Sequence, residues 1–202
     1  TSFPLIDTSS VLYANFAWFG YSSLTPFPLL DTSSVLNFQG TWWNCSNLTS
    51  FPLIDTSSGT NFQYTWKGCS SLTSFPSIDT SSATSLNYTW NDCSSLTSFP
   101  VIDLSGGSSI NIANAWSGCT SLTTFPVLDY SNVLYAFNTW INCALSVQSI
   151  ENILVALDTA GKSNVNTSVS GGTSAAKTTW SAAANTAYEN LISKGWTVAH
   201  NP

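Results

Sequence analysis

Charge is the scarcest property of this sequence. Only 7% of its 202 residues are charged, the formal net charge is −6, and the isoelectric point is near 4.2. Arginine is absent, and the four basic residues are Lys67, Lys162, Lys177 and Lys194. A protein that binds a nucleic-acid backbone needs clustered cations to displace the counterions of the phosphates. The composition therefore predicts that nucleic acid is not a partner.

Features that would indicate a membrane protein or an enzyme are also missing. The chain has no apolar run of about 18 residues, so we expect no membrane insertion. It has no G-x-S-x-G motif, no glycine-rich phosphate loop and no His/Glu metal motif. His200, the one histidine, stands near the end, where we expect a frayed residue rather than a catalytic one. The sequence predicts a protein that is not an enzyme.

An internal repeat dominates what is present. Phe-Pro recurs six times, in steps of 24 residues that lengthen once to 26. The longer step contains Gly106 and Gly107, which are expected to form a surface bulge. Thr1 stands in the middle of a repeat and methionine is absent, so we expect a fragment or a processed product. A fixed period of this length is typical of a repeat solenoid, in which each repeat buries its apolar side against its neighbours. Tryptophan keeps the same period, at Trp18, Trp42, Trp66, Trp90, Trp116 and Trp140.

The spacing within one repeat predicts its local structure. Apolar residues four and three apart around Trp66 predict a short helical segment. The following apolar residues are three apart, which fits a coil that turns repeatedly around one core. A short strand is expected over 72–76, because the proline there donates no hydrogen bond to a sheet. Parallel pairing would stack equal side chains about 4.8 Å apart. We therefore predict six coils around a buried row of tryptophans.

The recurring motif W-x-x-C-S-S-L-T-S-F-P-x-I-D-T-S-S resembles the BspA-like leucine-rich repeats of bacterial and phage surface proteins. The match covers residues 1 to about 145, and six copies agree at five or more positions. Tryptophan stands where that family usually has phenylalanine, and the segment over 75–79 is short. The resemblance implies a leucine-rich-repeat-like right-handed coil of six repeats with short parallel strands. It also implies an extracellular, cell-surface or virion location and an adhesive or structural role, such as that of a tail fibre.

Residues 144–202 leave the repeat and are expected to form an α/β C-terminal cap on the array of residues 1–143. Helices are predicted over 149–160 and 175–194, each ended by a glycine. Strands are predicted over 165–169 and 196–199, and a turn over 171–174 is expected to cap the second helix. This order of segments is similar to the tail of many phage-encoded repeat proteins, which favours the same surface or virion role.

Cysteine occupies one position of nearly every repeat. The spacing lacks the C-x₂₋₄-C pairs that are typical of zinc sites, and the odd number fits a disulfide framework poorly. One small buried thiol per coil explains the period, so we expect reduced and metal-free cysteines. They are Cys45, Cys69, Cys93, Cys119 and Cys143.

Aspartate forms a further row, and each member begins a D-x-S turn in which its carboxylate is expected to accept backbone N–H groups. One alternative is a calcium site between carboxylates stacked about 5 Å apart. Another is a pair of catalytic carboxylates acting on a glycan, which requires two different environments. Because every aspartate has the same setting, we expect no catalytic pair. Because turn capping accounts for each carboxylate, we expect no cofactor. The row is Asp7, Asp31, Asp55, Asp79, Asp103 and Asp129.

Two surfaces are candidates for contact with partners. The first is an uncharged hydroxyl surface suited to a glycan or to ice. The second is an assembly face at the N-terminal end, which upstream coils, another copy or a neighbouring subunit would cover. The hydroxyl surface comprises Thr25, Thr49, Ser50, Thr73, Ser74, Thr97, Ser98, Thr123 and Thr124, and the assembly face comprises Phe3, Leu5 and Ile6.

These observations predict a non-enzymatic surface or virion protein. It would recognise a cell-surface protein or glycan, or mediate assembly with neighbouring subunits or copies of itself. One alternative is an ice-binding protein that uses the threonine and serine rows. A weaker alternative is a carbohydrate-active enzyme.

Overall fold

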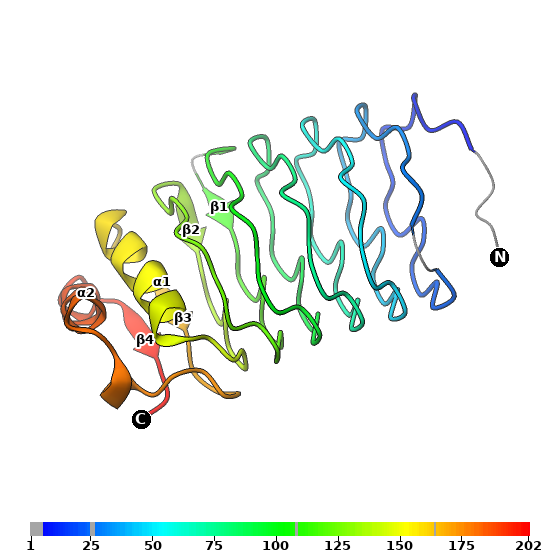
Figure 1. The fold of residues 1–202 in the computed structure, drawn as a ribbon. Helices are drawn as coiled ribbons and strands as arrows, with labels where there is room; N and C mark the ends of the chain where they lie inside the picture. Colours follow the sequence, from blue (N-terminus) through cyan, green and yellow to red (C-terminus); the bar gives the residue numbers. More distant parts are fainter. Residues whose placement is uncertain (1–5, 25–26, 108, 164) are drawn as a thin grey trace.

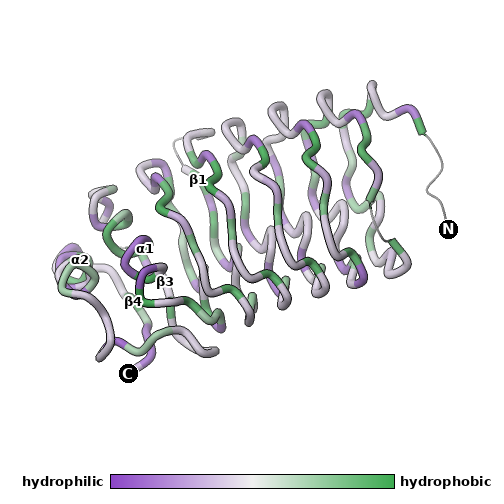
Figure 2. Tube along the Cα trace, in the orientation of Figure 1, coloured by the Kyte–Doolittle hydropathy of each residue, from purple (hydrophilic) through white to green (hydrophobic). Residues whose placement is uncertain are grey.

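Successive 24-residue stretches form coils that stack side by side along one axis (Figure 1). Hydrophobic stretches recur at matching places on successive coils (Figure 2). The C-terminal residues lie at one end of the stack and carry both of the helices labelled there (Figure 1). The computed structural model describes residues 6–24, 27–107, 109–163 and 165–202.

Most parallel pairing between coils lies on the segment that precedes each tryptophan, although one bridge joins Ser98 to Thr124 on the Phe-Pro side. Its longest part joins β1 (Ile110–Asn111) to β2 (Val133–Tyr135). The strand expected over 72–76 is wrong, because that segment is not assigned to a strand. It carries a proline, which donates no hydrogen bond to a sheet. In the other coils the pairing is reduced to single bridges, which run from Tyr13 through Asn37, Asn61 and Ser85 to Asn111.

The helical segment expected around Trp66 is also wrong. Tyr64 and Gly68 lie two residues before and after it with φ of 60° and 71°. Left-handed residues at these positions interrupt a right-handed helix. The N–H of Lys67 instead bonds to the carbonyl of Tyr64 at 3.2 Å, and the N–H of Trp66 donates to Thr89 of the next coil at 2.8 Å. Each coil therefore turns tightly here while it presents its backbone to its neighbour.

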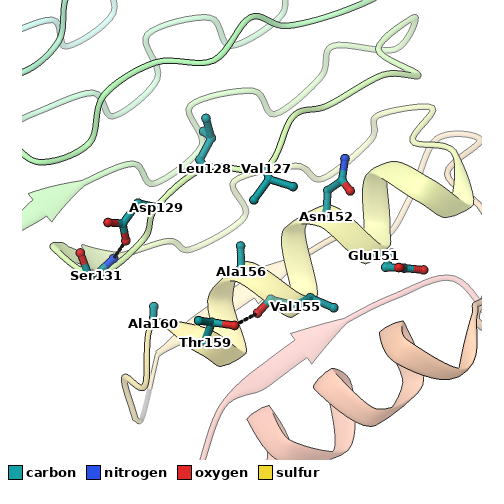
Figure 3. A pocket seen from close by; sticks show the side chains of 10 residues that line it. All are labelled: Val127, Leu128, Asp129, Ser131, Glu151, Asn152, Val155, Ala156, Thr159 and Ala160. Carbon is teal, nitrogen blue, oxygen red and sulfur yellow. Dashed lines mark hydrogen bonds between the residues drawn. The ribbon is translucent and has the colours of Figure 1, made fainter.

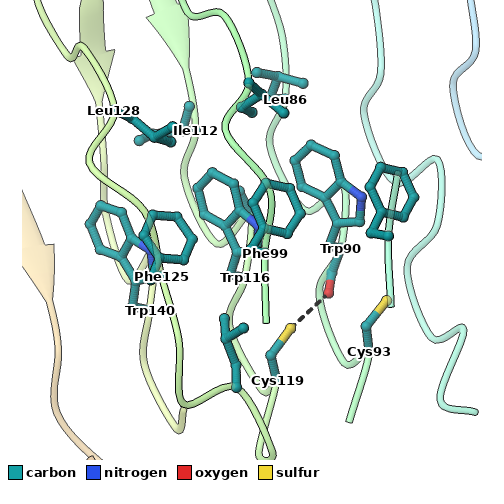
Figure 4. Close-up of a cluster of buried hydrophobic side chains, with 14 of the residues drawn as sticks. Leu86, Trp90, Cys93, Phe99, Ile112, Trp116, Cys119, Phe125, Leu128 and Trp140 are labelled. Atoms are coloured by element: carbon teal, nitrogen blue, oxygen red, sulfur yellow. Dashed lines mark hydrogen bonds between the residues drawn. The ribbon is translucent and has the colours of Figure 1, made fainter. Parts of the chain in front are cut away.

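The core is a double row of aromatic rings (Figure 4). Neighbouring tryptophan rings from Trp42 to Trp140 are 5.3–5.9 Å apart and within 8° of parallel. Phenylalanine rings form a second row that meets the indoles edge to face, as where Phe75 lies 4.8 Å from Trp66 at 73°. Five indole N–H groups of this row are buried without a hydrogen-bond partner among the described residues. Burying these N–H groups without partners costs free energy, which the packing of the rings must offset.

The glycine pair of the longer repeat does more than bulge at the surface. A Cβ on Gly106 would lie 2.5 Å from the backbone nitrogen of Ala83 in the preceding coil, whereas a Cβ on Gly107 would meet nothing closer than 3.5 Å. Gly106 therefore allows two backbones to approach closely, which no other residue permits. The expected surface bulge therefore holds for Gly107 only, and Gly106 is a packing contact between coils.

Residues 144–202 close the far end of the stack. Helix α1 (Val147–Thr159) contacts the last coil, where Asn152 Nδ2 donates to the carbonyl of Phe125 at 2.9 Å. Strands β3 (Asn166–Ser168) and β4 (Thr197–Ala199) pair in parallel, with Asn166 opposite Thr197. Neither of the helices in the described residues is long and apolar enough to cross a membrane. The elements are α1 (Val147–Thr159), β3 (Asn166–Ser168), the 3₁₀ turn η1 (Lys177–Thr179), α2 (Ala182–Ser193) and β4 (Thr197–Ala199).

The second helix begins seven residues later than the sequence pattern predicts. Ser181 is its N-cap and accepts a hydrogen bond from the N–H of Ala184 at 3.0 Å. Trp180 is extended, and η1 ends just before it. The alanine-rich stretch alone does not distinguish a helix from the turns before it, and the serine cap sets the boundary. The first helix, by contrast, ends as expected, with Gly161 at φ of 70°.

Candidate functional site

The predicted hydroxyl surface is present on the outside of the stack. Thr25 lies outside the described residues, and the other eight residues are exposed. The hydroxyls of Thr73, Thr97 and Thr123 donate to carbonyls of the preceding coils at 3.3, 3.5 and 3.2 Å. Each threonine thus commits its one hydroxyl hydrogen to a neighbouring coil and offers mainly acceptor lone pairs to solvent.

The aspartate row lies at exposed turns. Asp55 Oδ1 accepts the N–H of Ser57 at 3.0 Å and its hydroxyl at 2.7 Å, and the same turn recurs in the other coils. Hydrogen bonds from the following serine lower the pKa of Asp7, Asp55 and Asp79. These carboxylates therefore stay ionised at neutral pH, each with one oxygen outside the turn. Among the described residues there is no group of three or more side chains that could hold a metal ion.

An apolar ridge runs beside the aspartate row, and sequence reasoning missed it. The ridge residues are Leu29, Leu53, Val101 and Val127, which follow Phe-Pro in their repeats and are 71%, 63%, 61% and 59% exposed. Ser77 stands at the equivalent position in the fourth of the six repeats. The signal was the x of F-P-x-I-D, which is apolar in five of six copies but stands outside the inward-facing pattern. Large apolar side chains this exposed, repeated in line, are typical of an interaction surface.

A groove follows the ridge toward α1. One part, of about 670 Å³, runs from Ser77 to Asp129 and has the carboxylates of Asp79 and Asp103 on its border. The next part, of about 630 Å³, lies between the last coil and α1. In this second part Val127 lies across from Asn152 of the helix (Figure 3). Apolar side chains and carboxylates line the groove, and none of its lining residues is basic.

The cysteines lie in the core and not at a reactive site. All five are free and buried, and each thiol donates to the carbonyl of a tryptophan in the preceding coil at 3.1–3.2 Å. Burial raises the pKa of Cys45 to about 11 and that of Cys143 to about 12. It also raises the pKa of Cys69, Cys93 and Cys119. A thiol that stays protonated is a poor nucleophile, so this row serves packing.

His200 is packed rather than frayed, so that expectation is wrong. Its ring lies 5.4 Å from Trp180 and 5.3 Å from Tyr188, edge to face in both cases. Its Nδ1 is 2.8 Å from the carbonyl oxygen of Asn201. Among the described residues, its contacts are with aromatic rings and backbone, and not with a nucleophile or a carboxylate.

The predicted assembly face is described only in part. Ile6 is 43% exposed, whereas Phe3 and Leu5 lie outside the described residues. Leu12 and Tyr13 follow in the first coil and are 47% and 68% exposed. Apolar surface therefore continues from Ile6 into this coil.

Comparisons with protein-family models, with curated proteins and with solved structures give no match to this chain. A role is therefore assigned from the chemistry of its surfaces. The two strongest features are the apolar ridge with its acidic groove and the hydroxyl surface.

Proposed function

We propose that this chain is a non-enzymatic surface or virion protein, built as a BspA-like, leucine-rich-repeat-like solenoid that recognises a partner or mediates assembly. The observation that carries the proposal is the apolar ridge. Leu29, Leu53, Val101 and Val127 are exposed by more than half, although the recurring tryptophan, cysteine and phenylalanine positions from Trp42 onward are buried. Selection for stability alone does not place leucine and valine there, because exposed apolar side chains gain nothing from burial.

The charge beside the ridge selects the partner. Asp79, Asp103 and Asp129 border the groove, and Glu151 of α1 extends the negative charge to its end. All three lysines of the C-terminal part and Lys67 are absent from the lining. A protein surface that presents apolar side chains flanked by lysine or arginine complements such a groove. Charge pairing of this kind speeds encounter and weakens with salt.

The same row argues against catalysis by paired carboxylates. An acid and a base need environments that separate their pKa values, but the residues of the aspartate row all stand in the same serine turn. A carbohydrate-active enzyme therefore stays the weaker alternative.

Ice binding is the second candidate, and the exposed threonine and serine rows favour it. Thr73, Thr97 and Thr123 repeat on one uncharged face at the coil period. Measurement of thermal hysteresis decides between the two roles. We expect no hysteresis, and a hysteresis that is lost in Thr73→Val/Thr97→Val would establish ice binding instead.

Assembly through the N-terminal end is the other form of the proposal. Ile6, Leu12 and Tyr13 provide apolar surface for a second copy or a neighbouring subunit. Light scattering of the wild type and of Leu12→Glu tests this contact. We expect the wild type to associate with increasing concentration and the variant to do so less, and a wild type that stays monomeric would exclude it.

The ridge is tested by selecting a displayed random-peptide library against the immobilised protein. We expect enriched peptides that combine apolar residues with lysine or arginine and that dissociate at high salt. The double variant Leu53→Ser/Val101→Ser should no longer bind these peptides, because the substitutions remove two exposed ridge side chains without touching the core. Thr73→Val/Thr97→Val, on the hydroxyl surface, is the matched control and should retain binding. Peptides that bind the ridge variant as well as the wild type would refute the proposal.

A further inference from the structure

A second exposed feature lies on a different part of the coils, where each chain turns around its tryptophan. Trp43, Tyr64 and Tyr88 come from three successive coils and form a stack, which we call the aromatic ribbon. Their ring centroids are 5.2 and 5.1 Å apart. The three side chains are partly exposed, and Phe19 extends the ribbon by an edge-to-face contact with Trp43 at 5.1 Å. None of these residues lines the groove beside the ridge.

Backbone conformation indicates that the tyrosines are not there for stability alone. Tyr64 and Tyr88 have φ of 60° and 59°, in the left-handed region that bulky residues avoid. Three other coils place Gly40, Asn114 and Asn138 at the equivalent position, all with positive φ. Glycine and asparagine adopt this conformation with little strain. Aromatic rings are therefore present against the local preference of the backbone, which is a pattern found at functional sites.

Lys67 supplies the charge of the ribbon. Its ammonium lies 5.9 Å from the rings of Trp43 and Tyr64 and 5.1 Å from that of Tyr88, within reach of a cation–π contact. It is the only basic residue in the first 161 positions of an acidic chain. It has no carboxylate partner among the described residues, since both ion pairs found there involve Lys177 and Lys194. The ribbon thus holds one uncompensated positive charge.

Two amide side chains come from residues next to these turns in the sequence. Gln39 and Gln63 stand next to the turn positions of their coils and are partly exposed. Gln39 Nε2 donates to Gln63 Oε1 at 3.3 Å, which leaves the second hydrogen of that amide and the amide nitrogen of Gln63 for other partners. Three stacked rings from successive coils, two amides and one cation suit a ligand that is itself an extended, hydroxyl-rich chain with carboxylates.

We propose that the aromatic ribbon binds an acidic polysaccharide. The apolar C–H faces of its sugars pack on the exposed parts of Trp43, Tyr64 and Tyr88, and the glutamine amides bond to its hydroxyls. A sugar carboxylate pairs with Lys67, which the rings already hold in place. This site is separate from the ridge, so it does not depend on the function proposed above.

The test is titration calorimetry on the whole chain with two carboxylated glycans, polygalacturonate and hyaluronate. Pullulan serves as a neutral glycan, and polyglutamate serves as a polyanion without sugars. We expect at least one carboxylated glycan to bind about tenfold or more tightly than either control. Absence of binding to both glycans would overturn the proposal, as would equal binding of polyglutamate.

Variants separate binding from packing. Lys67→Met should weaken binding about tenfold and remove its dependence on salt. Tyr64→Asn/Tyr88→Asn should abolish binding while the melting temperature stays the same or rises, because asparagine suits the left-handed backbone. Tyr135→Asn is the matched control, since it removes an exposed tyrosine elsewhere and puts in the residue that Asn111 provides one coil earlier. A double variant that melts at a lower temperature and still binds would show that the rings serve packing, and would refute the proposal.

Discussion

The repeat array and the C-terminal part are held together by different kinds of contact. In the array, the hydrogen bonds of the side chains mostly link positions one coil apart. Thr32 Oγ1, for example, donates to the carbonyl of Asp55 at 2.5 Å, and Thr65 Oγ1 to that of Phe38 at 2.9 Å. In residues 144–202, helices satisfy their own backbones, and side chains join one helix to the other.

Charge is distributed in the same uneven way. Both ion pairs of the described residues lie in the C-terminal part, Lys177 with Glu189 at 3.6 Å and Lys194 with Asp158 at 2.5 Å. The array relies on buried rings and on hydroxyl and thiol groups that donate to neighbouring carbonyls. A change in the array therefore acts on two interfaces between coils, whereas a change in the C-terminal part acts on the docking of α1 against α2.

The largest effect is expected from Trp66→Ala. The ring is fully buried between the rings of Trp42 and Trp90, and its removal leaves a cavity that stacked coils cannot close. The free energy of unfolding should fall by about 3–5 kcal/mol. For Trp180→Ala, in the C-terminal part, we expect a loss of stability at the lower end of that range. The partly exposed Tyr188 can move into the gap there. Denaturant titration measures both, and the reverse order would show that the array is not the more tightly packed region.

Gly106→Ala is expected to come next. The new Cβ would lie 2.5 Å from the nitrogen and 2.6 Å from the oxygen of Ala83, and backbone atoms cannot step aside. Such overpacking should cost about 1–3 kcal/mol. Gly107→Ala is the adjacent control and should change stability by less than about 0.5 kcal/mol, since its Cβ would meet only Thr84 at 3.5 Å. Equal effects of the two substitutions would mean that the coils can slide apart at this point.

A pH-dependent effect is expected at Asp158. Burial raises its pKa, but hydrogen bonds from Asn190 and Lys194 and the charge of Lys194 outweigh burial and lower it. A carboxylate with a lowered pKa contributes stability that is present above the pKa of the unfolded chain, about 3.9. This stability is lost as the pH falls through the pKa of the folded protein. Asp158→Asn should therefore cost about 1 kcal/mol at pH 7. Thermal melts across pH should show this difference shrinking below about pH 4, and a difference that persists in acid would contradict the ion pair as its cause.

The smallest effect is expected from Ser57→Ala in an aspartate turn. The substitution removes the hydroxyl that donates to Asp55 at 2.7 Å and leaves the backbone N–H bond at 3.0 Å. The loss should be about 1 kcal/mol or less. Chemical denaturation that found it costlier than Trp66→Ala would show that the turns, rather than the ring row, hold the coils together.

Periodicity predicted the buried side chains better than it predicted the backbone. The tryptophan, cysteine and leucine positions recur because each fills the same place in the core, and from Trp42 onward they are fully buried. The helix expected at Trp66 failed because Tyr64 has positive φ, and a tyrosine in sequence gives no sign of a left-handed residue. Gly106 was misjudged for a related reason, since its contact with Ala83 lies 23 positions away and depends on how coils stack.

The candidate binding surfaces were predictable only where polarity marked them. The threonine and serine rows were found because hydroxyls recur in line. Leu53 and Val101 were overlooked, because their position falls outside the inward-facing pattern and nothing in the sequence marks it as exposed. The aromatic ribbon was hidden for another reason, because Trp43 does not share the repeat position of Tyr64 and Tyr88.

The tryptophan row has an optical consequence. Five indoles from Trp42 to Trp140 stand 5.3–5.9 Å apart in nearly parallel planes, away from water. Chromophores this close couple electronically and pass excitation along the row before they emit. The near-ultraviolet absorption and the emission of the folded protein should therefore differ from those of the unfolded chain, in which the indoles are apart. Removal of one central ring divides the row into two shorter emitters, so the spectrum itself reports whether neighbouring coils remain in register.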